Sequence, residues 1–261
     1  MPKRLASLLA PAVTGLLALT AWETLVRARE IPPYVLPGPL LIGRTLLTDG
    51  PSLLGSLRFT LEVTGLALLA SAVLGALLAV LMVQSRWIES SLFPYAVILQ
   101  VTPIVSIAPL IIIWVDKPFV ALLICAWIVA FFPVVSNTTL GLRSADPYLV
   151  DLFRLYGASR WQTLVHLQLP TALPYFLAGL RISGGLALVG AVVAEFVAGT
   201  GGAETGLAAR ILEAGYRLQI PRLFAALLLL ALSGVLIHVA LSLLTSRLLR
   251  HWHASALPGQ R

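Results

Sequence analysis

Few side chains in this sequence are of a type that does chemistry, and one of them stands out. Glu195 is an acid well inside a long apolar stretch. A carboxylate at membrane depth is costly and indicates a role in a pathway or a gate by default. Gly199, Gly201 and Gly202 follow closely and favour an early helix end, so Glu195 could instead lie at the outer headgroups or pair with an arginine such as Arg210.

Other polar side chains accompany prolines in two further apolar stretches. Pro103 and Pro109 each remove a backbone donor, and irregular backbone at membrane depth is tolerated where it is buried in protein or lines a cavity. The polar residues near these prolines, and a pair near the inner end of the next stretch, are therefore candidates for a solute pathway. They are Gln100, Thr102, Ser106, Ser136 and Asn137. A simple proline kink explains each of them equally well when it is taken alone.

The motifs of several enzyme classes are missing. A P-loop needs G-x-x-x-x-G-K-[ST], but the only lysines are Lys3 and Lys117, and neither follows a glycine. The zinc motif H-E-x-x-H is excluded because no histidine precedes a glutamate. Cys125 is the only cysteine, so the chain has no intrachain disulfide or multi-cysteine metal site. We expect no catalytic residue, no metal site and no cofactor in this chain, with any ATP and Mg²⁺ bound by a separate polypeptide.

Composition indicates a membrane protein. Of the 261 residues, 59% are hydrophobic and 11% are charged, whereas a soluble domain carries about 25% charged residues. A membrane-spanning helix needs about 20 apolar residues, and backbone groups in lipid must pair internally. The sequence therefore predicts an all-α polytopic membrane protein, a single domain over 1–261 with six spans. These lie at about 5–26, 61–84, 90–115, 119–142, 177–201 and 223–246.

The formal net charge of +7 indicates a lipid bilayer rather than nucleic acid as a partner. The basic residues are scattered at the ends of the apolar stretches, where they anchor to headgroups, and they form no dense run. With six spans both termini lie on the same side. Lysine and arginine are slightly more numerous on that side, which weakly indicates cytoplasmic termini.

The segment 143–176 has the pattern of two short helices. Asp146 followed by Pro147 is typical of an N-cap and a first helical position, and apolar residues follow at helical spacing. Gly157 favours a left-handed stop. Ser159 and Gln162 then have the S-x-x-Q spacing of a capping box.

We expect Pro170 to close the second of these helices. The pattern therefore predicts a helix–glycine turn–helix hairpin outside the bilayer. Such a hairpin is either an interfacial connector or a docking element for a soluble partner, and its own pattern does not choose between them.

The hairpin resembles the cytoplasmic loop of permease subunits of binding-protein-dependent ABC importers, whose pattern is E-A-A-x3-G-x9-I-x-L-P. The glycine and its spacing to the terminal Leu-Pro match, while the opening E-A-A is degenerate. The matching residues are Asp151-Leu-Phe153, Gly157, Leu167, Leu169 and Pro170. Further likeness extends from about Ile31 to the end of the last span. Over this range the sequence resembles the nitrate, taurine and alkanesulfonate branch of these permeases, which includes importers of thiamine-pyrimidine precursors and riboflavin.

The resemblance implies the type I importer permease fold and an ATPase-coupling role for the hairpin. The residues expected to carry that role are Asp151, Arg154, Gly157, Ser159, Arg160, Leu167, Leu169 and Pro170. It implies a bacterial inner-membrane protein with both termini in the cytoplasm. The implied partners are a second permease chain in a homodimer, two ATP-binding subunits, and a periplasmic or lipid-anchored solute-binding protein. The implied cargo is a small solute such as a sulfonate, taurine, nitrate or a pyrimidine-like compound.

Small side chains recur every three or four residues along the fifth span. They are Ser183, Ala187, Ala191, Ala194 and Ala198. Such a stripe lets helices approach closely in lipid, so it predicts contact with neighbouring spans or with a second copy. Because alanine is common in membrane helices, a chance arrangement is the alternative.

Two other functions stay open as alternatives. A self-powered secondary transporter is the first, although such proteins typically have internal repeats and intramembrane charges for ion coupling. An intramembrane hydrolase is the second and less favoured one, because it needs a paired nucleophile and base.

Overall fold

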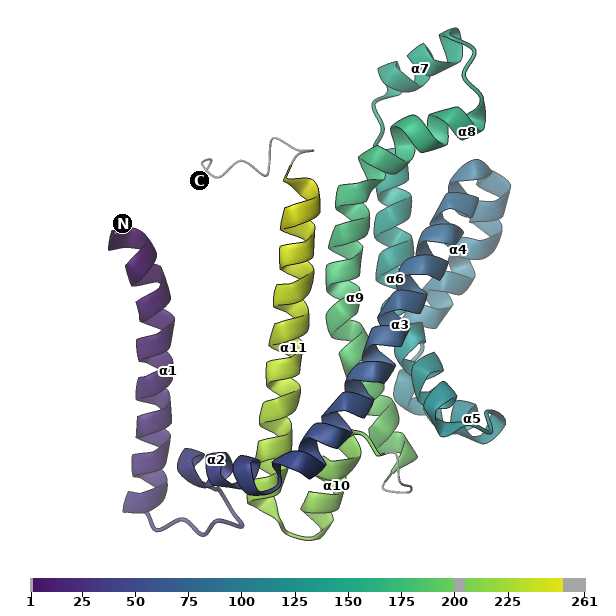
Figure 1. Ribbon diagram of the computed structural model, residues 1–261. Coiled ribbons are helices and arrows are strands. Elements are labelled where there is room, and N and C mark those ends of the chain that lie inside the picture. The colour runs from purple at the N-terminus through teal and green to yellow at the C-terminus, as the bar shows by residue number, and fades with distance from the viewer. Residues whose placement is uncertain (1, 200–204, 251–261) are drawn as a thin grey trace. The chain divides into compact units, whose positions relative to one another are not determined.

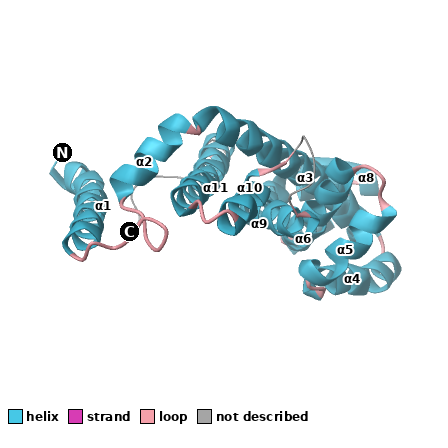
Figure 2. Cartoon of the chain, turned by 90° about the horizontal axis from the view of Figure 1, so that it is seen from below, coloured by secondary structure: helices cyan, strands magenta, loops and turns pink. Residues whose placement is uncertain are grey.

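The computed structural model describes residues 2–199 and 205–250. Within these ranges the chain is helical and has no strand (Figures 1 and 2). The elements are α1 (Pro2–Ala28), α2 (Pro39–Thr48), α3 (Gly50–Gln84), α4 (Arg86–Val101), α5 (Ile104–Trp114), α6 (Pro118–Arg143), α7 (Pro147–Leu155), α8 (Arg160–Thr163), the π-helix η1 (Leu164–Gln168), α9 (Leu169–Ala198), α10 (Leu207–Tyr216) and α11 (Ile220–Leu249). The prediction of an all-α protein is confirmed.

Among the described residues, four helices are long and apolar enough to cross a membrane. They are Gly50–Gln84, Pro118–Arg143, Arg160–Ala198 and Ile220–Leu249, and they overlap the predicted stretches 61–84, 119–142, 177–201 and 223–246. The stretch 90–115 is instead a pair of helices, α4 and α5, that bend by 100° at a short break and count as one further span if taken together. Because α1 covers the remaining stretch, 5–26, and α4 with α5 count as one span only if taken together, the number of six spans stays a prediction.

The break between α4 and α5 lies at Pro103. Thr102 and Pro103 are extended, with ψ of 121° and 115°, because a proline disfavours the α region for the residue before it. The expected irregular backbone at Pro103 is confirmed. Pro109, in contrast, lies inside α5 without ending it.

The chain divides into two compact units. One comprises Met1–Phe59 and Gly199–Ala231, and the other comprises Thr60–Ala198 and Leu232–Arg261. The single permease domain over 1–261 stays a prediction.

The larger unit is centred on the pairing of α6 with α9. A Cβ added at Gly179 would lie 2.7 Å from the carbonyl oxygen of Pro133, and one at Gly190 would lie 2.9 Å from Cα of Ala126. The two backbones therefore touch at these glycines, as small residues allow in helices packed within lipid. Ser183 adds a hydrogen bond, since its hydroxyl donates to the carbonyl of Ala130 at 2.6 Å.

The predicted small-residue stripe follows the same α6–α9 contact. Four of its five members are buried, and the fifth, Ala198, is exposed at the end of α9. The buried members are Ser183, Ala187, Ala191 and Ala194. The expected contact with a neighbouring helix is thus confirmed.

The smaller unit is built around apolar residues of α2, α10 and the adjoining turns of α3 and α11. Its core contains Ile42, Leu53, Leu207, Ile211, Ala225, Ala226 and Leu229. Trp22 of α1 packs against this core, with its ring 6.0 Å from that of Phe224.

An ionic network surrounds α10 in this unit. Arg210 donates to Glu213 at 2.8 Å and to the hydroxyl of Ser56 at 3.1 Å. Arg217 lies 3.1 Å from the same carboxylate. The hydrogen bond from Arg210 is the main reason why the pKa of Glu213 is lowered below its ordinary value of 4.5.

Candidate functional site

The first helix of the predicted hairpin forms as its sequence requires. The carboxylate of Asp146 accepts a hydrogen bond from the backbone N–H of Tyr148 at 2.9 Å, and Pro147 occupies the first turn of α7. The helix ends at Gly157, whose φ is +70°. In that left-handed conformation a side chain costs free energy and glycine does not. The predicted N-cap and glycine stop are both confirmed.

The second helix starts with the predicted capping box. The hydroxyl of Ser159 accepts the N–H of Gln162 at 3.2 Å, and the Gln162 side chain accepts the N–H of Ser159 at 2.7 Å. Two backbone donors at the start of α8 are thereby satisfied within four residues. The hairpin turn is therefore fixed on both sides by local hydrogen bonds.

Pro170 does not close this helix, so the prediction that it does is wrong. The chain from Arg160 to Ala198 is one helical run of 39 residues. The π-helix η1 lies just before Pro170, and the N–H of Leu169 bonds to the carbonyl of Leu164, five residues back. A wider π turn changes the position of the preceding carbonyls, with which a proline ring clashes in a regular α-helix. The hairpin is consequently continuous with α9.

The base and the tip of the hairpin differ in burial. At the base, Leu164 packs with Ala79 of α3, Leu142 of α6 and Ala172 of α9. At the tip, α7 has no buried residue. Tyr148, Leu152 and Leu155 of α7 are exposed, which leaves an uncovered apolar face on this amphipathic helix, and the helix lies beyond the ends of α6 and α9 (Figure 1). The most exposed large side chains of the hairpin are Tyr148, Leu155, Tyr156 and Trp161, at 85%, 84%, 84% and 70%.

The predicted coupling residues fall into two groups. Five are exposed at the hairpin and lie together there: Asp151, Arg154, Gly157, Ser159 and Arg160. The other three lie where the hairpin joins α9. Leu167 is buried, Pro170 is half-buried, and Leu169 is 40% exposed.

One ion pair at the start of the hairpin was not indicated by the sequence. Arg143, the last residue of α6, pairs with Glu89 in the first turn of α4. The pair connects the helix that leads into the hairpin with the turn that follows α3. The two residues are 54 positions apart, so no local spacing could have revealed it.

Glu195 is buried inside the larger unit. Its side chain is 2% exposed, and its Oε1 accepts a hydrogen bond from the hydroxyl of Thr60 at 2.8 Å. The bond joins α9 to α3. Whether Glu195 lies in a pathway or at the level of the outer headgroups stays a prediction. Thr60 is a site residue that sequence reasoning missed, because the hydroxyl lies 135 positions away.

The remaining pathway candidates lie at two separate places. Gln100, Thr102 and Ser106 come together at the bend between α4 and α5, where the hydroxyl of Thr102 donates to the carbonyl of Ile98 at 2.6 Å. On α6, Ser136 and Asn137 are half-buried, and the Asn137 amide donates to the carbonyl of Pro133 at 2.8 Å.

Comparison with known proteins gives the family. Residues 71–251 match the family described as binding-protein-dependent transport system inner membrane component. The chain belongs to this family. It is 36% identical over 253 residues to the riboflavin transport system permease protein RibX of Chloroflexus aurantiacus, covering 93% of this chain and 90% of that protein. It is 32% identical over 249 residues to the formylaminopyrimidine transport permease protein ThiX of Halalkalibacterium halodurans, and the match covers 95% of this chain and 97% of that protein.

A solved structure shows the same fold. A chain from the crystal structure of an amino acid ABC transporter with histidines matches with a TM-score of 0.62 at 20% identity, covering 78% of this chain and 97% of that chain. The resemblance to ABC importer permeases stated from the sequence is confirmed.

Family membership defines the class of function. The chain is a permease subunit of a binding-protein-dependent ABC importer of small solutes, a multi-pass protein of the inner membrane. It is a transport subunit without an ATPase site of its own, and importers of this family depend on an ATPase and a solute-binding protein. The comparisons do not support a self-powered secondary transporter or an intramembrane hydrolase.

Proposed function

We propose that the hairpin 143–176 docks on a cytoplasmic ATPase subunit and carries its movement to the spans. The observation that carries this proposal is the exposure of the apolar residues of α7, none of which is buried. An amphipathic helix with an unpartnered apolar face fits the groove of a partner protein. The proposed orientation has the hairpin and both termini in the cytoplasm.

The continuity of the helices supports transmission of movement. The hairpin is continuous with α9 through η1, and its base packs against α3 and α6. When a bound ATPase subunit moves the hairpin, α9 moves with it. We propose an assembly of two copies of this chain with two ATPase subunits, which bind ATP and Mg²⁺, and a periplasmic or lipid-anchored solute-binding protein.

The pathway is proposed to involve the buried hydrogen bond between Thr60 and Glu195. A carboxylate with 2% exposure on a membrane helix is a functional candidate by default. In this proposal the bond holds α3 to α9 in one state of the transport cycle and breaks in another. The polar residues at the α4–α5 bend, with Ser136 and Asn137, would line the route of the solute.

The proposed cargo is a small heteroaromatic compound. Two relatives similar over nearly their whole length are named for riboflavin and for formylaminopyrimidine. A sulfonate, taurine or nitrate is the alternative cargo. Measuring which of these compounds the cognate solute-binding protein binds distinguishes the two.

Coupling is tested with two substitutions at one position. Gly157 has φ of +70°, which a β-branched residue avoids and asparagine tolerates. In liposomes that contain the complete importer, Gly157→Val should abolish the stimulation of ATP hydrolysis by the loaded binding protein, whereas Gly157→Asn should retain most of it. If Gly157→Val couples as well as wild type, the hairpin is not the coupling element.

A further inference from the structure

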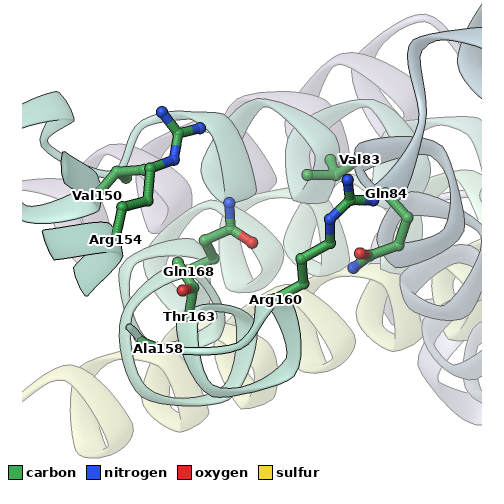
Figure 3. Close-up of a pocket in the computed structure, with 8 residues that line it drawn as sticks. All are labelled: Val83, Gln84, Val150, Arg154, Ala158, Arg160, Thr163 and Gln168. Carbon is green, nitrogen blue, oxygen red and sulfur yellow. The ribbon is translucent and has the colours of Figure 1, made fainter. Parts of the chain in front are cut away.

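A polar cavity lies in the hairpin beside the end of α3. Its volume is about 460 Å³, and its walls come from the end of α3, from α7 and from the run α8–η1. The polar side chains in its wall are Gln84, Arg154, Arg160, Thr163 and Gln168. Figure 3 shows Gln168 between the two arginines, with Gln84 next to Arg160.

The lining of this cavity is rich in donors and contains no carboxylate. Arg154 pairs with Asp151 at 3.3 Å, but both side chains are largely exposed, so solvent weakens this pair. Arg160 forms no ion pair within the part of the chain that the structure describes. Guanidinium groups bind phosphate and carboxylate through paired, charge-assisted hydrogen bonds. The cavity therefore suits an anion.

The position of the cavity along the chain favours phosphate at the membrane surface. Gln84 is the last residue of α3, a long apolar helix. Arg86 and Trp87 follow after Ser85, and Trp87 is 83% exposed. Arginine and tryptophan at the end of a membrane helix are typical of the headgroup level, where lipid phosphates lie.

The cavity and the proposed docking face occupy different sides of α7. Val150 and Arg154 are four residues apart and line the cavity. Tyr148 and Leu155 lie on the opposite side at a helical period of 3.6 residues, and they are the large apolar side chains with the greatest exposure on α7. An ATPase subunit docked on the exposed side leaves the cavity side free, which argues against an acidic segment of that subunit as the occupant.

We propose that this cavity binds a phosphate group, supplied by the headgroup of an anionic phospholipid or by a soluble phosphate. Arg154 and Arg160 provide the charge-assisted donors, and the amides of Gln84 and Gln168 and the hydroxyl of Thr163 complete the site. Binding there joins α3, α7 and α8, so an anion stiffens the hairpin at its base. The site shares Arg154 and Arg160 with the predicted coupling residues, but binding of phosphate there does not require a docked ATPase subunit.

The test uses the full chain and two probes. Retention of phosphatidylglycerol against phosphatidylcholine is measured by native mass spectrometry from mixed nanodiscs, and binding of inorganic phosphate is measured by calorimetry in an uncharged detergent. The variant is Arg154→Gln with Arg160→Gln. The matched control is Arg247→Gln with Arg250→Gln, which removes the same charge from the end of α11, outside the cavity.

Loss of one charge-assisted contact is worth about tenfold in affinity, so we expect the cavity variant to lose at least about tenfold for one probe. The control should stay near wild type. If the cavity variant loses affinity for phosphatidylglycerol alone, the natural ligand is a lipid headgroup. If it loses affinity for inorganic phosphate, the ligand is a soluble phosphate. Equal binding of both probes to wild type and cavity variant, with unchanged thermal unfolding, overturns the proposal. A second result also overturns the proposal: the cavity variant binds the ATPase subunit more weakly but binds both probes as well as wild type does. That result would assign the cavity to an acidic segment of the partner.

Discussion

The hydroxyl of Thr60 on α3 donates a hydrogen bond to the carboxylate of Glu195 on α9 over 2.8 Å. Both side chains are buried, and a buried acceptor that loses its donor keeps its desolvation penalty. This bond therefore offers a direct way to separate stability from transport.

Replacing Thr60 tests the bond. Thr60→Val keeps the shape and removes the donor, so it should lower the free energy of unfolding by about 1.5–3 kcal/mol. Thr60→Ser keeps the hydroxyl and should cost less. Unfolding by heat or denaturant in detergent measures both. A valine variant as stable as the serine variant would show that this donor contributes nothing.

Glu195→Gln tests the pathway role separately. The amide keeps an acceptor for Thr60 but removes the carboxylate, so we expect near wild-type stability together with reduced solute uptake in reconstituted liposomes. Stability is read from thermal unfolding of the same preparation. Unchanged uptake would remove Glu195 from the pathway.

Two glycines on α9 should respond in opposite ways to the same substitution. A Cβ at Gly179 meets the carbonyl oxygen of Pro133 at 2.7 Å, whereas a Cβ at Gly185 meets nothing within 4 Å. Gly179→Ala should destabilise by about 1–3 kcal/mol through overpacking. Gly185→Ala should be neutral or stabilise by about 0.5–1 kcal/mol, because alanine favours helix. Thermal unfolding of the two variants measures these changes in stability. Equal changes in the two variants would contradict the tight α6–α9 contact.

The ion pair between Glu89 and Arg143 should contribute little to stability. Its side chains are 22% and 48% exposed, and exposed pairs are typically worth about 0–1 kcal/mol. A double-mutant cycle with Glu89→Gln and Arg143→Gln should give a coupling energy in that range. A coupling above about 2 kcal/mol would instead indicate a pair that is buried in the assembled importer.

The network around α10 should make stability depend on pH in the acidic range. Because Arg210 lowers the pKa of Glu213 below 4.5 in the folded state, the carboxylate stabilises the fold at pH values above 4.5 and loses that contribution as the pH falls through the lowered pKa. Glu213→Gln should therefore unfold at a lower temperature than wild type near neutral pH, and the difference should shrink in acid. Asp116→Asn, in the turn before α6, is the control. A difference that does not change with pH would contradict this assignment.

The sequence predicts the local features of the hairpin well and its distant contacts poorly. The Asp146 cap, the Gly157 turn and the Ser159 capping box each depend on residues within four positions of one another, so their spacing is visible in the chain. The donor of Glu195 and the partner of Arg143 come from residues far away in sequence, and many hydroxyls and carboxylates were equally eligible.

The clearest wrong prediction from the sequence concerns proline. Pro103 ends a helix, Pro109 does not, and Pro170 follows a π turn that keeps the helix intact. A proline excludes one backbone hydrogen bond, but whether the chain bends or widens its turn depends on the packing around it. Near Pro170, the buried residues Leu164 and Leu167 of η1 hold the helix in place on both sides of the wider turn.

The unbroken run from Arg160 to Ala198 has a mechanical consequence. At 1.5 Å per residue, its 39 residues measure roughly 58 Å along the helix axis, which changes direction between α8 and α9 (Figure 1). One end begins at the hairpin turn, and the other ends three residues beyond Glu195. A movement imposed at the turn is therefore carried along one continuous helical backbone to the end that holds Glu195, through the π-helix η1 and past Pro174.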